Sequence, residues 1–433
     1  MPISKKLVTV FAILLTFSAP LFGQAVRSPF STFGIGDVYG DYLIQNQGMG
    51  GMGVSQPQYW FINNQNPALL VYNLNTVFQA GLIGESKKVA SAEASEKGFG
   101  GNLNYLATAF PIMPIARNPY RTRWSTALGL MPYSTVNYNL TYTERAVDGT
   151  GALKDTVAII ESGSGGLNQF YWSNGFTVAK NLSIGIKAAY IFGPLETSYQ
   201  NQFINNDGNS PSFFTEVKEK TSVKDFKFTF GISYGDTLRR NYGYQVGATY
   251  SPVARLSASR RAEVLRFTPG RPLPIEGDTL FTRGGSMRIP GSLTVGVSFY
   301  RINRWLLGTE FNYQDWSSFE SISQDDENLA ESWRGALGGE FTPDLYSDNL
   351  LKRMTYRLGI NYEKYPFIVN GNQVNDFGIN FGFSIPANRS SLDMAFKVGK
   401  RGDRGENIFE ETYFKVYFGV TFNDKWFIQR KFD

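Results

Sequence analysis

A chain of 433 residues with no cysteine, no histidine and a formal charge of only +5 excludes several classes of protein. Without cysteine there are no disulfides or thiolate metal sites, and without histidine there are no Ser–His arrangements or imidazole ligands. A lysine or carboxylate base remains possible, but no spacing points to one. The charge is too balanced and scattered for a nucleic-acid footprint. We therefore predict no enzyme, no cofactor, no metal and no nucleic-acid partner.

The composition combines many aromatic residues with a low mean hydropathy. Phenylalanine occurs 35 times and tyrosine 24 times, and aromatic residues make up 15% of the chain, yet the mean hydropathy is −0.24. A transmembrane β-barrel has this mixture, because apolar and aromatic side chains face lipid while alternate positions face a polar interior.

Residues 1–25 have the pattern of a secretory signal peptide. Lys5 and Lys6 precede the apolar run 7–17, Pro20 ends that run, and Gly23 and Ala25 offer small residues for cleavage. The alternative is a membrane anchor, but the run is shorter than the ~20 apolar residues of a spanning helix.

Residues 26–72 follow neither a strand nor a helix pattern. They are rich in Gly, Asn and Gln, and they contain the aromatic residues Phe30, Phe33, Tyr59, Trp60 and Phe61. Aromatic rings fill irregular space, and glycines such as Gly48, Gly50 and Gly51 let backbone pass close to a wall. We interpret this segment as a compact plug inside the domain formed by residues 73–433.

The remainder of the chain alternates between apolar and small or polar residues with a period of two. Phe414, Val416, Phe418, Val420 and Phe422, for example, are separated by polar or small residues. Side chains of a strand point to opposite faces in turn, so each run predicts a strand with one apolar face. A soluble sandwich would share this pattern, but aromatic residues at strand ends favour a membrane barrel. About fourteen such runs occur: 74–84, 101–112, 122–140, 156–178, 182–200, 222–235, 242–258, 285–300, 305–316, 332–341, 354–363, 374–385, 390–399 and 412–422.

The links between these runs alternate between short and long. Short turns are expected at 180–181, 236–241, 301–304 and 387–390, and long polar loops at 85–100, 201–221, 259–284, 317–331, 364–373 and 400–411. Outer-membrane barrels have short periplasmic turns and long extracellular loops. The pattern predicts an all-β outer-membrane barrel of antiparallel strands in contact with lipid, with both termini periplasmic.

Closure and plugging follow from physical constraints. An open sheet cannot span a bilayer, because every backbone N–H and C=O must be paired there. A barrel of this size is wider than the ~8 strands whose own side chains fill the interior. The segment 26–72 is available to fill the remaining space.

Several short motifs resemble the outer-membrane long-chain fatty-acid transporter family (FadL-type). They are Gly48-Met49-Gly50-Gly51 followed by Asn66-Pro67-Ala68, the run 128–133 with Gly129 and Pro132, and the run 289–297. The opening 28–36 and the end 422–433 resemble a distant branch of that family. The last ten or so residues, which extend past the final strand, depart from the transporter pattern.

The resemblance implies passive uptake of a hydrophobic molecule. A hydrophobic ligand or a detergent would occupy the lumen, and the molecule would leave sideways through the wall at a kinked third strand. Pro132 supports a side exit, because proline cannot donate to a strand ladder and marks a bulge or break. The alternative is that Pro132 lies at the membrane edge, where broken pairing faces water.

The resemblance also implies that Asn66-Pro67-Ala68 holds the plug to the wall and moves on substrate binding. From the residues alone it is equally an entry turn into the first strand, since Asn-Pro favours turns. Inward charges such as Lys187, Lys227 and Arg357 are expected to pair with the plug or line water.

A second function fits the same fold. The barrel would be a non-transporting subunit of an outer-membrane secretion or protein-assembly complex, with protein partners bound by extracellular loops. The loop 259–284 with Arg260, Arg261, Arg266 and Arg271 is a candidate, because arginine is favoured at interfaces. An apolar pocket open to the outside would favour transport, and a lumen closed by polar contacts would favour the subunit.

Overall fold

The structure is a computed structural model of the whole chain. It describes residues 25–113, 123–147, 153–204, 214–238, 241–268, 273–322 and 329–424. The expected signal sequence, apart from Ala25, and the end of the chain at 425–433 lie outside the described residues.

Strands dominate the described residues, and most of them pair antiparallel with the next strand of the chain. Their bounds are β2(Thr76–Ala90), β3(Ser95–Met113), β4(Trp124–Thr135), β5(Tyr138–Val147), β6(Leu153–Ala179), β7(Leu182–Ile204), β8(Phe214–Thr237), β9(Tyr242–Ser251), β10(Ala254–Phe267), β11(Glu276–Ile289), β12(Ser292–Arg301), β13(Trp305–Asp315), β14(Glu331–Phe341), β15(Thr355–Val369), β16(Asn372–Ala387), β17(Ser390–Arg401) and β18(Glu410–Asp424).

These segments form a closed antiparallel barrel of 14 strands within the described residues. Three of the fourteen strands consist of two segments each. β4 and β5 form one strand, because both pair with β6, and β9 and β10 form another, because both pair with β8. β11 and β12 form the third, because they pair with β10 and β9 respectively. The last strand closes on the first, with Asp424 opposite Thr76 and Glu410 opposite Ala90. The prediction of a fourteen-stranded barrel is confirmed.

The alternation of side chains explains why the sheet closes. On β18, Phe414 and Phe422 are exposed on the outside, whereas Glu411, Tyr413 and Tyr417 are buried inside. The same alternation on neighbouring strands gives the barrel an apolar exterior and a polar interior.

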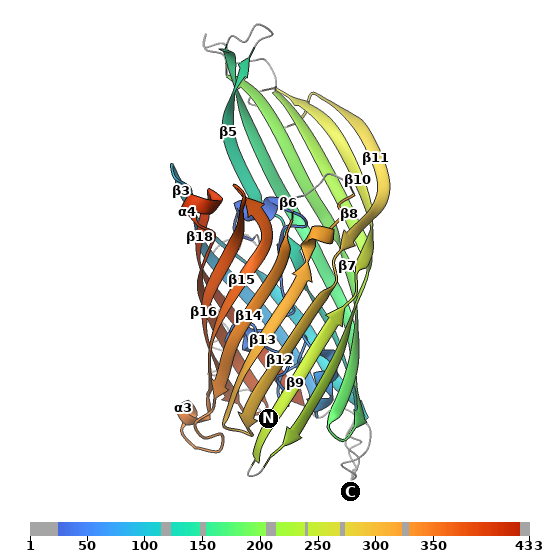
Figure 1. Cartoon of the computed structure of the whole chain (residues 1–433), viewed down its shortest axis with the longest axis vertical. Helices are drawn as coiled ribbons and strands as arrows, with labels where there is room; N and C mark the ends of the chain where they lie inside the picture. Colours follow the sequence, from blue (N-terminus) through green and yellow to red (C-terminus); the bar gives the residue numbers. More distant parts are fainter. Residues whose placement is uncertain are drawn as a thin grey trace, which may run out of the picture.

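Tight turns join the strands at the lower end of Figure 1. Asn303 and Asn388 adopt positive φ angles of 59° and 61° in two of these turns. Asparagine tolerates this left-handed region better than most residues do, which explains its recurrence there.

Four of the expected long loops prove to be strand extensions instead. Residues 85–90 and 95–100 pair with each other, 364–369 and 372–373 belong to β15 and β16, and most of 259–284 belongs to β10 and β11. Parts of 201–221 belong to β7 and β8. The prediction was wrong because these extensions carry charges on both faces, as in Lys218-Glu219-Lys220, so the apolar alternation that marks a membrane strand is lost.

The extensions make the barrel asymmetric. β6, β7 and β8 contain 27, 23 and 24 residues, whereas β13 and β14 contain 11 each. A spanning strand needs only ~9–11 residues. Figure 1 shows β5 to β8, β10 and β11 rising as a tall curved wall above the other strands.

The remaining elements are short. They are β1(Asp37–Val38), α2(Ile44–Gln47), α3(Leu350–Arg353) and α4(Arg404–Asn407), with 3-10 turns η1(Pro29–Thr32), η2(Pro67–Tyr72) and η4(Trp316–Ser318). Among the described residues, none of the helices is both long and apolar enough to cross a membrane.

Candidate functional site

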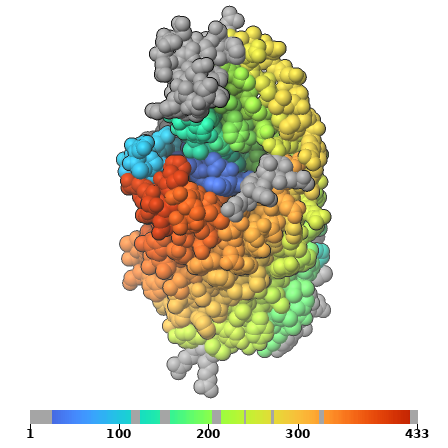
Figure 2. Space-filling model, turned by 45° about the horizontal axis from the view of Figure 1, so that its top comes forward, coloured from blue at the N-terminus to red at the C-terminus, as the bar shows by residue number. Residues whose placement is uncertain are grey.

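Residues 25–73 contact strands on several sides of the barrel wall. Helix α2 lies against β16, β17 and β18, and η2 lies against β4, β6, β7 and β8. Figure 2 shows this segment in blue at the bottom of a hollow between the tall wall and the lower rim. Nearly all residues from Leu43 to Pro57 are buried, so the segment has the packing of a folded interior.

Glycines allow the segment to touch the wall. Gly48 and Gly50 lie directly over β15 and β16, and a Cβ atom at Gly338, Gly359 or Gly382 of the wall would collide with Gly48, Met49 or Gly50. Gly50 and Gly51 have positive φ angles of 71° and 80°, which favour glycine. These residue choices fix residues 48–51 at backbone contact distance from the wall.

A buried ion pair anchors the adjacent turn. Glu310 on β13 accepts hydrogen bonds from the backbone N–H groups of Gly53 and Val54, both at 2.8 Å. Arg334 on β14 lies 3.7 Å from Glu310 and donates to the carbonyl of Gly50. Hydrogen bonds to charged groups are stronger than neutral ones, so this contact fastens the segment to one side of the lumen.

The Asn66-Pro67-Ala68 turn is anchored to another part of the wall. The Asn66 carboxamide accepts from the Ala68 N–H at 3.0 Å and donates to the carbonyls of Val54 at 2.8 Å and Ile232 at 3.1 Å. A Cβ atom at Gly175, Gly185 or Gly231 would collide with this turn. Asn66 therefore caps η2 and joins the segment to β8.

The aromatic residues expected to pack the segment divide into two groups. Phe30 and Phe61 are buried, and the half-buried ring of Phe33 stacks on Phe367 at 5.4 Å. Trp60 is 48% exposed and Tyr59 is 36% exposed, so the expectation that they pack inside was wrong. Their stretch lies at the short-turn end, where Asn423 near the end of β18 donates to the Trp60 carbonyl at 3.0 Å, and it faces solvent there.

Charged side chains of the wall pair with the segment or with one another. Lys187, which is 2% exposed, lies 2.8 Å from Asp41, and Arg401 lies 2.7 Å from Asp37. Arg357 pairs with Glu340 at 3.2 Å. Lys227 lies over the Tyr133 ring at 5.7 Å.

The pKa of Asp41 reflects its pairing. Burial disfavours the charged carboxylate, but Lys187, Lys227 and the hydrogen bond from Gln169 together outweigh burial, and the pKa of Asp41 lies below its usual value. Asp41 is therefore ionised at neutral pH inside the lumen.

The cavity that remains beside the segment measures about 270 Å³. Its lining includes Lys227, Glu363, Lys397 and Lys415. A site for a hydrophobic ligand is mostly apolar with only a few polar groups, whereas this cavity combines those charged groups with aromatic residues such as Tyr133, Trp316 and Phe367.

The wall is incomplete beside β4. β3 pairs with β4 only from Leu106–Leu130 to Met113–Trp124, so among the described residues 95–105 pair with β2 alone. The β4–β6 register shifts between Pro132 and Ser134, whereas Gly129 is paired regularly and leaves room for the Tyr171 ring. We call the gap between residues 95–105 and residues 131–147 the seam.

Residues 25–39, which we call the strap, cross the seam. Val38 pairs with Ser134 and Asp37 with Thr135. The Ser28 N–H donates to the Asn137 carbonyl at 2.8 Å, and Arg27 lies 3.8 Å from Glu96 on β3. The strap thus touches both sides of the gap.

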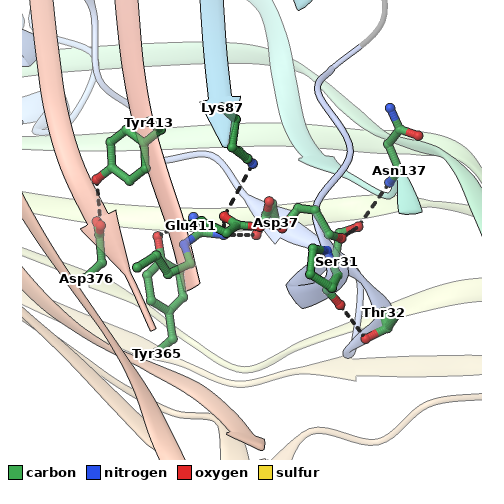
Figure 3. Close-up of polar contacts among 12 residues, drawn as sticks. Ser31, Thr32, Asp37, Lys87, Asn137, Tyr365, Asp376, Glu411 and Tyr413 are labelled. Atoms are coloured by element: carbon green, nitrogen blue, oxygen red, sulfur yellow. Dashed lines mark hydrogen bonds and ion pairs between the residues drawn. The ribbon is translucent and has the colours of Figure 1, made fainter. Parts of the chain in front are cut away.

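A cluster of polar contacts clamps the strap from within, as Figure 3 shows. Glu411, which is fully buried, accepts from the Ser28 hydroxyl at 2.5 Å and lies 3.5 Å from Lys87. Arg401 reaches Asp37 and also donates to the Tyr365 hydroxyl at 3.0 Å.

Sequence reasoning missed this clamp and the Glu310–Arg334 pair. The available signal was a charged residue at an inward position of an apolar strand, such as Glu310 beside Phe311. Such a signal identifies a buried charge but not its partner, because Glu310 contacts residues 53 and 54, which are distant in sequence.

Comparison with solved structures identifies the fold. The CymD monoaromatic hydrocarbon channel has a TM-score of 0.54 and 12% identity, over 91% of this chain and 99% of that one. The Ralstonia pickettii toluene transporter TbuX has a TM-score of 0.54 and 14% identity, over 88% and 98%. A Pseudomonas aeruginosa FadL homologue has a TM-score of 0.54 and 12% identity, over 89% and 98%.

The fold is therefore that of FadL-type outer-membrane barrels. No curated protein matches the sequence. One family model, that of BamG, matches residues 3–433, and the chain belongs to the BamG family.

Proposed function

We propose that this barrel is a sealed interaction subunit of an outer-membrane secretion or protein-assembly complex. The observation that carries the proposal is the polar closure of the lumen. The N-terminal segment is bound to β13 and β14 through Glu310 and Arg334 and to β8 through Asn66. Segment 26–72 acts as a fixed plug, and the protein functions by binding partner proteins on its surface and not by letting solutes pass through its lumen.

The cavity supports this choice over transport. A hydrophobic solute crossing the lumen would have to pass charged groups such as Lys227 and Lys415 without compensating for their lost hydration. The large apolar cluster near the strap is already filled by the chain's own side chains, among them Phe30, Trp316 and Phe367.

The tall wall, which we place outside the cell with both termini periplasmic, is one surface for partner binding. Arg260, Arg261 and Arg266 lie on β10, not on a loop, and pair with Glu219, Glu263 and Glu276 respectively. Arg271 lies outside the described residues. These arginines already have partners, so the wall as a whole is a better candidate for docking than a basic loop.

Isolation in a mild detergent tests the proposal. The full chain should elute with other outer-membrane proteins at fixed ratio and should carry no apolar ligand. Deleting its gene should lower the amount of folded barrel proteins in the outer membrane. Elution as a single chain with an apolar ligand in the lumen would contradict the proposal.

A second candidate is uptake of a hydrophobic compound, such as a fatty acid or a small aromatic molecule. The specific observation in its favour is the irregular pairing at Pro132, beside the seam, in a fold shared with hydrocarbon channels. In this scheme the plug would move through Gly48, Gly50, Gly51 and the 66–68 turn, and Phe30 and Phe33 would face the ligand. Toluene uptake into vesicles that contain the purified protein tests it, and uptake equal to that of empty vesicles would exclude it.

A further inference from the structure

Among the described residues, the seam leaves one strand edge without a neighbour at membrane depth. Register relates Phe99 on β3 to Ser86 on β2 and Phe414 on β18, and Leu103 to Leu82 and Phe418. Phe414 and Phe418 belong to the apolar outer face of β18, so the edge at 99–105 lies at the level of the apolar band. Lipid cannot satisfy backbone N–H and C=O groups there.

The exposure of this edge is consistent with an uncovered strand. Phe99 is 81% exposed and Leu103 is 39% exposed. Asn102 is exposed as well, so exposure does not alternate here as it does on strands with two neighbours. Gly98, Gly100 and Gly101 leave little side-chain bulk beside the backbone. An edge of this kind is a template for another strand.

The strap shows that strand addition occurs at the seam, but it fills only part of the gap. Its ladder on β4 covers Ser134 and Thr135, with one further hydrogen bond from the Tyr39 N–H to the Tyr133 carbonyl at 2.9 Å. On the β3 side it contributes the side chains of Val26, against Gly98, and Arg27, and among the described residues it forms no strand pairing with β3. Within the part of the chain that the structure describes, the β3 edge therefore adjoins this interface and has no strand partner of its own; the Asn102 side chain accepts from the Leu103 N–H at 2.8 Å.

We infer that the β3 edge, residues 95–105, is an acceptor for a β-strand of a neighbouring outer-membrane polypeptide. The strand it fits is extended and has apolar residues at alternate positions, because its neighbours Phe99 and Leu103 face outward beside lipid. Its length matches the ~9–11 residues of a spanning strand. This inference rests on the proposed role as an interaction subunit and gives that role a contact site.

A peptide probe tests the acceptor in the purified full-length chain in detergent. The probe carries a benzophenone and has the sequence of residues 412–422, a strand of the required alternation. Its control is the same peptide with every second amide N-methylated, which removes strand hydrogen bonding and keeps the apolar side chains. We expect photolabelling within 95–105 and about tenfold less with the methylated peptide.

Matched variants localise the effect. Phe99→Lys/Leu103→Lys places charges on the edge and should lower labelling about tenfold, because lysine protects edge strands. Phe414→Lys/Phe418→Lys places the same charges at the same level on β18, which has a neighbour on both sides, and should leave labelling of β3 unchanged. Equal labelling by the methylated peptide, or labelling spread over β16 to β18, would overturn the inference.

The two proposals fail differently. A complex that forms normally while the peptide shows no preference for the β3 edge overturns the acceptor site and leaves the interaction role intact. Labelling confined to 95–105 in a chain that joins no complex supports the acceptor and contradicts the proposed function.

Discussion

Buried ion pairs between single residues stabilise the N-terminal segment against the barrel wall. Lys187 and Asp41 come from β7 and from the N-terminal segment, and Lys187 also donates to the Asn64 carbonyl at 3.4 Å. A buried charge that loses its partner costs far more than an exposed one, because its lost hydration is not replaced. Removing only one residue of such a pair should therefore lower the free energy of unfolding, because the other charge stays buried without its partner.

Replacing Asp41 alone should destabilise the protein more than replacing the pair. Asp41→Asn leaves Lys187 uncompensated and should lower the free energy of unfolding by about 3 kcal/mol. The double variant Asp41→Asn/Lys187→Met should recover most of that loss. Urea unfolding in lipid vesicles, followed by tryptophan fluorescence, measures both, and additive losses would show that the two residues are not coupled.

Two glycines of one strand offer a matched pair. Gly338→Val on β14 should push Met49 away from the wall, because a Cβ there collides with the Met49 carbonyl. A Cβ atom at Gly335 on the same strand meets no atom within 4 Å, so Gly335→Val serves as control. Planar-bilayer recordings should show added conductance for Gly338→Val only; equal conductance of both variants would mean that residues 48–50 do not seal this side.

Among the elements, the strap and the interrupted β4 decide whether the wall can open. The strap is pinned at both ends of its path, by Glu411 at Ser28 and by Arg401 at Asp37. β4 departs from regular pairing at Pro132, as expected for a residue that cannot donate to the ladder.

A disulfide between strap and β4 tests whether the strap must move. Val38 and Ser134 lie directly opposite each other, a spacing that suits a disulfide, and the chain has no other cysteine. Val38→Cys/Ser134→Cys should oxidise readily and leave assembly into the complex unchanged, since the β3 edge stays free. Loss of assembly that reduction restores would show that strap release is required.

Pro132→Val addresses the rival transport function. Valine restores the missing N–H and should extend regular pairing on β4. If hydrophobic uptake uses a side exit there, uptake into vesicles should fall to the level of empty vesicles. Unchanged uptake would show that the transported molecule does not leave through the wall at Pro132.

For the molecule as a whole, the sequence predicted the membrane-spanning parts of the strands better than their extensions beyond the membrane. Period-two runs such as 414–422 predicted the membrane strands because lipid and lumen impose opposite polarities on successive residues. Beyond the membrane that constraint ends, and residues such as Lys218 and Glu219 gave no strand signal although they pair with β7 and β10.

The seam and the clamp could not be predicted for a related reason. Pro132 indicated a break, but the loss of the β3 neighbour at 95–105 is a property of pairing that no local pattern encodes. The partners of Arg401 and Glu411 lie more than 300 positions away in the sequence, at Asp37 and Ser28. Trp60 was misplaced because an aromatic residue in an irregular segment gives no indication of which end of the lumen it occupies.

The central claim, a lumen sealed by polar contacts, is tested most directly by permeation through the full-length protein in liposomes. We expect ion and toluene fluxes equal to those of protein-free liposomes, and large ion flux once residues 26–72 are deleted. Saturable toluene flux through the intact chain would contradict the account.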